Sequence, residues 1–112
     1  MEQSQHQENL ATVYKGLEAS NRKGAYSLEE ARVVHESYSN MVKVFEDITK
    51  HENKCTLTKD QISNSLKTVF TSLNRGSLHG TFTFDEGYLY RIAYEKVKNA
   101  TEEYVINSML AK

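Results

Sequence analysis

The chain has 112 residues, of which 38% are hydrophobic and 10% aromatic, which suffices for one domain with a modest core. Fourteen basic and fifteen acidic residues leave a net charge of −1, which excludes a global field that would draw the chain onto nucleic acid or an anionic membrane. No apolar run approaches the roughly 20 residues that span a bilayer, so we expect no membrane partner.

The cysteine content and the first residues predict an intracellular, reducing location. Cys55 is the single cysteine and cannot form an internal disulfide. Residues 1–8 are polar where a signal peptide needs an apolar stretch. The chain also lacks proline, so glycines and capping residues must mark its helix ends.

The first two predicted helices cover about residues 7–20 and 28–50. Helical spacing puts Leu10, Val13, Tyr14 and Leu17 on one face of the first. Ser27 and Glu30 have the spacing of a capping box, which predicts the start of the second. Its apolar stripe consists of Ala31, Val34, Tyr38, Met41, Val42, Phe45 and Ile48.

A third helix should begin after Thr58, which forms a second capping-box pattern with Gln61. Its apolar positions are Ile62, Leu66, Val69, Phe70 and Leu73. Residues 74–80 include two glycines, so we expect a break there.

The fourth predicted helix opens with the capping-box pair Thr83 and Glu86 and continues to about residue 109. Its expected core face is Leu89, Ile92, Ala93, Val97 and Ala100. Gly87 weakens the first turn by about 1 kcal/mol relative to alanine. We therefore expect a close helix contact that requires a small residue at this position.

An internal repeat gives the architecture. A shift of 56 positions superposes these seven identical pairs without a gap: Leu10/Leu66, Thr12/Thr68, Val13/Val69, Leu17/Leu73, Gly24/Gly80, Glu30/Glu86 and Tyr38/Tyr94. The pattern predicts an all-α four-helix bundle made of two helix-loop-helix repeats. One domain would comprise a polar arm (1–8), the first repeat (9–50), a connection (51–57) and the second repeat (58–112). Residues 24–27 and 80–83 would lie at one end, where a short β-bridge could join them.

The loop spacing resembles the end of an EF-hand, but the ligands are poor. With Gly24 as the sixth loop position, the first, third and fifth positions are alanine, asparagine and lysine. The second loop places arginine, serine and histidine there, whereas calcium requires several oxygen ligands. Glu30 and Glu86 fit the pattern, but capping explains both. A degenerate EF-hand-like regulatory or calcium-binding module is kept as an alternative.

Other site chemistry has little support in the sequence. The four histidines lack the spacing that puts two metal ligands on one helical face, and no catalytic motif recurs. Residues 75–80 could form a glycine-containing loop, but the lysine and the Ser/Thr that should follow the last glycine of a phosphate-binding loop are absent after Gly80. Lys and Arg are spread among acids, which argues against a nucleic-acid face, although an accessory nucleic-acid binder stays as an alternative. We expect no enzyme activity, cofactor or metal.

The strongest functional indication is a second apolar stripe on the fourth predicted helix. Positions 90, 94, 97, 101 and 105 lie beside the expected core face, and tyrosine is enriched in interface hot spots. We predict that Tyr90, Tyr94, Tyr104 and Val105 contact a protein partner, in a larger assembly or a homo-oligomer. The alternative is that these tyrosines cover neighbouring helices within the bundle.

Residues 10–34, and especially the phrase from Lys23 to Ala31, resemble a phrase of small helical proteins from large DNA viruses and phages. The resemblance covers about a quarter of the chain and implies a viral origin with a structural or assembly role. It transfers no functional residue. Together these features predict a non-enzymatic structural or protein-interaction module, such as a minor capsid or cement component of a virion.

Overall fold

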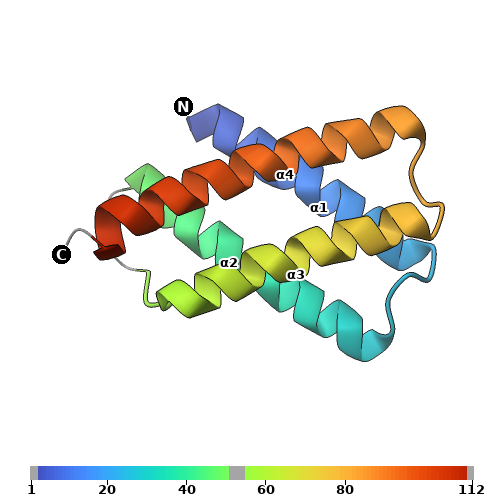
Figure 1. The fold of residues 1–112 in the computed structure, drawn as a ribbon, viewed down its shortest axis with the longest axis horizontal. Coiled ribbons are helices and arrows are strands. Elements are labelled where there is room, and N and C mark those ends of the chain that lie inside the picture. Colours follow the sequence, from blue (N-terminus) through green and yellow to red (C-terminus); the bar gives the residue numbers. More distant parts are fainter. Residues whose placement is uncertain (1–2, 51–54, 111–112) are drawn as a thin grey trace.

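The computed structural model describes residues 3–50 and 55–110 and is helical, with no strand among these residues (Figure 1). Four α-helices pack into a bundle, and a short π-helical turn continues the last. The elements are α1 (Gln3–Arg22), α2 (Leu28–Lys50), α3 (Lys59–Leu78), α4 (Phe84–Val105) and η1 (Ile106–Leu110).

The two halves lie in crossed layers. We call α1 with α2 the first unit and α3 with α4 the second unit. In the view of Figure 1, the second unit lies across the first, and the turns that close both units are at the same end. α1 packs chiefly against α4 and α3, and α2 packs chiefly against α3. Helices joined by a short turn therefore contact each other less than they contact the opposite unit.

Local sequence signals set the helix starts as expected. The Ser27 hydroxyl accepts from the Glu30 amide at 3.1 Å, while the Glu30 carboxylate accepts from the Ser27 amide at 2.9 Å. Thr58 with Gln61 and Thr83 with Glu86 form the same reciprocal pair at the starts of α3 and α4. These boxes satisfy amides that would otherwise lack a partner at a helix N-terminus.

The turns close on their own helices. Gly24 and Gly80 have φ angles of 83° and 79°, a region that favours glycine. The Ala25 amide donates to the Ser20 carbonyl at 3.0 Å, and the Thr81 amide donates to the Gly76 carbonyl at 3.1 Å. The described residues contain no β-bridge between the turns, since these amides are already used. The two turns instead approach each other at the His79 ring nitrogen and the Lys23 carbonyl, which are 3.0 Å apart.

α1 begins earlier than the sequence suggested. The predicted polar arm over residues 1–8 is helical from Gln3 onward, and His6 is buried with its ring 5.0 Å from that of Phe45. Burial lowers the pKa of His6, which favours the neutral imidazole. A histidine on an apolar face thus makes the start of α1 part of the bundle.

α3 ends later than expected, because Gly76 belongs to the helix interior. A Cβ at this position would overlap the side chain of Ser20 on α1. The glycine therefore permits close packing of α1 on α3 and does not break the helix. The break follows at His79 and Gly80.

The buried face of α4 differs from the predicted one. Ala93 and Val97 are buried as predicted, but Leu89 is 58% exposed, and Tyr94 and Thr101 of the second stripe are buried. The stripe assigned to a partner faces the core, because α4 turns it toward the other helices. An apolar side chain alone did not identify the inner face, since both stripes carry such residues.

Candidate functional site

Matched positions in the two units make the same long-range hydrogen bond. The Tyr38 hydroxyl donates to the Leu10 carbonyl at 3.2 Å, and the Tyr94 hydroxyl donates to the Leu66 carbonyl at 3.1 Å. Each bond ties the second helix of a unit to the first. In each unit a tyrosine side chain thus spans the space between the two helices at a matched position. A hollow lies beside this tyrosine in both units.

The two hollows correspond in position but differ in size. One of about 180 Å³ lies between α1 and α2, and one of about 610 Å³ lies between α3 and α4. Every residue that lines the smaller hollow has its counterpart 56 positions later in the lining of the larger. Several of the pairs differ in size or charge, among them Glu18/Asn74, Ala31/Gly87, Val34/Tyr90 and His35/Arg91. We call the larger hollow the α3/α4 groove.

Gly87 contributes to the openness of this groove. Apart from its chain neighbours and the adjacent backbone of α4, no atom of the described residues lies within 4 Å of the place where its Cβ would be, and its φ is not in the left-handed region. The expected close contact within the chain is therefore absent at this position. A glycine in a helix lowers stability by about 1 kcal/mol relative to alanine. No packing contact of the described residues at Gly87 offsets this loss.

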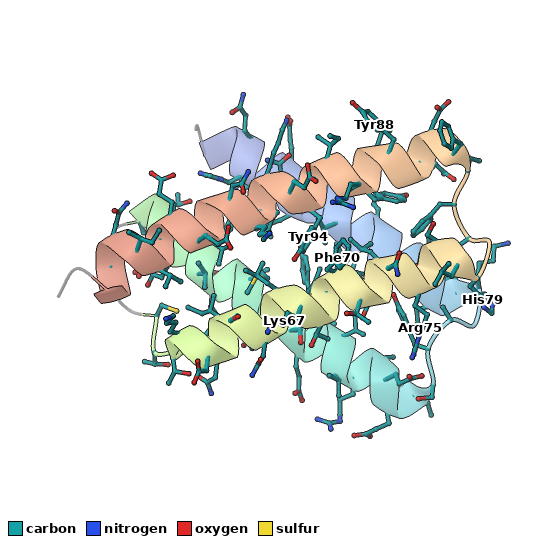
Figure 2. All side chains as sticks on the ribbon, viewed as in Figure 1. Lys67, Phe70, Arg75, His79, Tyr88 and Tyr94 are labelled. Atoms are coloured by element: carbon teal, nitrogen blue, oxygen red, sulfur yellow. The ribbon has the colours of Figure 1, made fainter. Side chains whose placement is uncertain are left out.

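Aromatic rings form the walls of the α3/α4 groove. The rings of Phe70 and Tyr94 are 5.2 Å apart, and those of Phe82 and Tyr90 are 4.7 Å apart. Figure 2 shows Phe70 and Tyr94 between α3 and α4. Burial raises the pKa of both Tyr90 and Tyr94, so their hydroxyls stay neutral at physiological pH. The walls present apolar ring surface and no tyrosinate charge.

One cation lies at the edge of the groove. The Arg91 guanidinium is 5.4 Å from the centre of the Phe70 ring and forms a 2.8 Å ion pair with Glu95. Its side chain remains 59% exposed. The other polar lining residues, Asn74, Ser77 and Thr83, are uncharged. The groove thus suits an apolar group, with a positive charge at one side.

Two aromatic side chains at the groove are open to solvent. Phe84 is 94% exposed and Tyr88 is 65% exposed, although both line the groove. They are one helical turn apart on α4, and Figure 2 shows Tyr88 projecting from its outer edge. Large exposed apolar surface beside a concave site is typical of an interaction surface.

The structure distributes the four predicted interface residues over two places. Tyr90 lines the groove and is half-buried, whereas Tyr94 is 6% exposed and offers a partner little surface. Tyr104 and Val105 are half-buried near the other end of α4. There the Tyr104 hydroxyl donates to Asp47 at 2.6 Å. The four residues therefore do not form one continuous outward stripe.

Sequence reasoning missed the most exposed part of the groove. Phe84, Gly87, Tyr88 and Arg91 follow the spacing i, i+3, i+4 and i+7, which defines one helical face. The signal that was available is the pairing of a glycine with two aromatic residues on this face.

The two glutamates that match the last position of an EF-hand loop, Glu30 and Glu86, make other contacts in the structure. The Glu30 carboxylate accepts from the Ser27 amide and pairs with Arg75, and these contacts lower the pKa of Glu30 to about 2. Glu86 completes the capping box of Thr83. Within residues 3–50 and 55–110, no three His, Cys, Asp or Glu side chains are grouped so that they could hold a metal ion. The same part of the chain has no helix with the length and apolar character to cross a membrane.

We compared the chain with protein-family models, curated protein sequences and solved structures, and none of the three comparisons gave a match. The assignment of function therefore depends on the geometry described above.

Proposed function

We propose that the protein is a non-enzymatic protein-interaction module whose contact surface is the α3/α4 groove. The observation that carries this proposal is the unequal size of two corresponding hollows, about 610 Å³ against about 180 Å³. The larger one has a helical glycine with open space around it and the strongly exposed rings of Phe84 and Tyr88 at its edge, whereas the smaller one has Ala31 in place of the glycine and the less exposed Tyr14. Of the two corresponding hollows, the one between α3 and α4 is therefore the better candidate for a contact surface.

The same correspondence supports a further part of the proposal, that the units are two copies of one helix-loop-helix repeat. The hydrogen bonds of Tyr38 and Tyr94, the positive φ angles of Gly24 and Gly80, and the capping boxes of Ser27 and Thr83 all occur at matched positions. Such a duplication leaves one copy free to acquire a binding surface while the other maintains the fold.

The shape of the groove favours a macromolecular partner. A small molecule inside the groove would leave most of Phe84 and Tyr88 in water, whereas a partner surface would cover them. Grooves between helices commonly receive an amphipathic helix through apolar anchors. Aromatic side chains supply much of the energy at such interfaces because they bury a large area.

The resemblance to small helical viral proteins extends the proposal to a minor capsid or cement component of a virion. Fractionation of a gentle extract of the native source by size, with mass spectrometry of the co-eluting proteins, tests this extension. We expect elution in a particle-sized complex beside an abundant coat protein. Elution of the chain alone near its mass of 12.8 kDa would contradict both the cement role and a stable interaction.

Affinity capture from the same extract tests the groove itself. Gly87→Leu adds a side chain to the open groove, and we expect the captured partner to be lost. Lys98→Leu adds the same side chain to an exposed position of α4 outside the groove and serves as the matched control. Equal capture by the two variants, with helical circular dichroism intact, would remove the groove from the interaction.

The calcium and nucleic-acid alternatives make different predictions. A calcium-dependent module should melt at a higher temperature when calcium is added, because a ligand that binds the folded state stabilises it. A nucleic-acid binder should be retained on heparin and released by salt. We expect neither behaviour from a module that binds through apolar side chains.

A further inference from the structure

α4 presents a face that combines projections with an opening. Phe84 and Tyr88 project from it, and Gly87 lies between them in sequence with no other helix or side chain of the described residues within 4 Å of its missing Cβ. Arg91 follows one turn after Tyr88 on the same face. A surface that carries both the projections and the opening is able to bind a copy of itself.

We propose that a second copy of the chain occupies the α3/α4 groove, with the two α4 helices packed antiparallel about a twofold axis between Gly87 and Tyr88. This inference rests on the proposed function and names the partner. The missing side chain at Gly87 lets the two helix backbones approach. Phe84 and Tyr88 of each copy then enter the groove of the other.

The antiparallel arrangement matches the order of charges on α4. Residues at equal distances from the axis face each other, so Phe84 of one copy lies beside Arg91 of the other. The guanidinium can then contact the aromatic ring of the second copy, as it already contacts Phe70 in its own chain. Asp85 of one copy also lies near Arg91 of the other, whereas a parallel pair would place the two Arg91 side chains together.

Charge and area are also consistent with a pair of identical chains. A net charge of −1 gives little long-range repulsion between two copies. Two aromatic side chains with the exposure of Phe84 and Tyr88 contribute about 300 Å² per copy. Together with the lining of the groove, this area gives a small interface, of the size found in weak and concentration-dependent complexes.

Sedimentation equilibrium of the purified full chain over a wide concentration range tests the proposal. We expect a concentration-dependent rise from 12.8 kDa to twice that mass. Gly87→Leu and the double change of Phe84 and Tyr88 to serine should each weaken the association by about tenfold or more. Lys98→Leu should associate like the wild type, and circular dichroism should show unchanged helicity in every variant.

A charge exchange identifies the antiparallel contact specifically. Asp85→Arg and Arg91→Asp should each weaken the dimer, and the double variant should recover most of the lost affinity because the pair is restored across the axis. A merely structural role of these exposed residues would not produce such a recovery. Failure of the double variant to recover, with the fold intact, would overturn the antiparallel arrangement.

The outcomes separate this inference from the proposed function. A wild-type chain that stays monomeric at every concentration overturns the second copy as the occupant, and partner capture from the native extract then decides the proposed function independently. A dimer that Gly87→Leu does not weaken places the contact elsewhere and also overturns the inference. A monomer that captures a different protein through the groove would retain the proposed function with another occupant.

Discussion

The side chain of Ser20 on α1 occupies the place that a Cβ of Gly76 on α3 would take. Ser20 is fully buried, and its hydroxyl donates to the Gly16 carbonyl one turn earlier at 2.8 Å. The two helices therefore cross at the point where the Ser20 side chain contacts the backbone of Gly76. This contact lies between the units and fixes how closely they approach.

Gly76→Ala should destabilise the protein by about 1 to 3 kcal/mol, the usual cost of adding volume to a packed core. Alanine raises helix propensity, so a loss of stability would identify the steric contact as its cause. Urea unfolding followed by circular dichroism measures the change. The double variant with Ser20→Gly should recover part of the loss, since it removes the opposing side chain. A Gly76→Ala variant as stable as the wild type would show that α1 and α3 do not meet at this place.

Tyr38→Phe and Tyr94→Phe should each cost about 0.5 to 1.5 kcal/mol, because each removes one hydrogen bond to a backbone carbonyl. Tyr88→Phe is the matched control, since Tyr88 is 65% exposed and its hydroxyl is not needed for packing. Thermal and urea unfolding of the three variants compare them directly. If the control loses as much stability as the other two, the long-range hydrogen bonds have no special weight.

Glu30 should make the stability depend on acid pH. Its folded pKa is lowered from 4.5 to about 2 by the hydrogen bond from the Ser27 amide and by Arg75. The contribution of the carboxylate is complete above pH 4.5 and is lost as the pH falls toward 2. Glu30→Gln keeps the capping-box geometry without the charge, so its melting temperature should fall less across this interval.

The matched control for this pH dependence is Glu46→Gln, a change at an exposed position of α2. We expect its melting temperature to follow the wild-type curve. A Glu30→Gln curve parallel to the wild type would show that the pairing with Ser27 and Arg75 does not affect acid stability.

Tyr104 should make the stability depend on alkaline pH, with the opposite sign. Burial and the hydrogen bond to Asp47 raise the pKa of Tyr104 above 10.0. The folded state favours the protonated phenol, so this contribution is present below pH 10.0 and is lost as the pH rises further. Tyr104→Phe should cost about 1.5 to 3 kcal/mol at neutral pH, as for a hydrogen bond to a charged group. The variant should also lose less stability than the wild type in alkali, which chemical unfolding at several pH values measures.

The helix starts could be predicted because their signals are local. A hydroxyl at the cap and a glutamate or glutamine three residues later bond each other's backbone amides whatever the rest of the chain does. The pairs opened by Ser27, Thr58 and Thr83 behave in this way. The end of α3 could not be predicted from local signals. In the sequence alone Gly76 indicates a helix break, whereas in the structure it lies opposite Ser20 and permits a close helix crossing.

The site was only partly predictable for a similar reason. Tyr90 was expected at an interface and lines the groove, but Tyr94 was expected beside it and is buried. Both carry the same side chain on the same helix. Their different roles depend on the rotation of α4 about its axis, which the contacts with α1 determine.

The sequence by itself determined the number of α-helices and the starts of α2, α3 and α4, because periodicity and capping act over a few residues. Only the tertiary structure decided which of two apolar stripes on α4 is buried and which of two matched hollows is open. Those outcomes depend on how two crossed units fill space between them. Gly87 is an example, since only the surrounding structure shows that its missing side chain leaves an opening and not a contact.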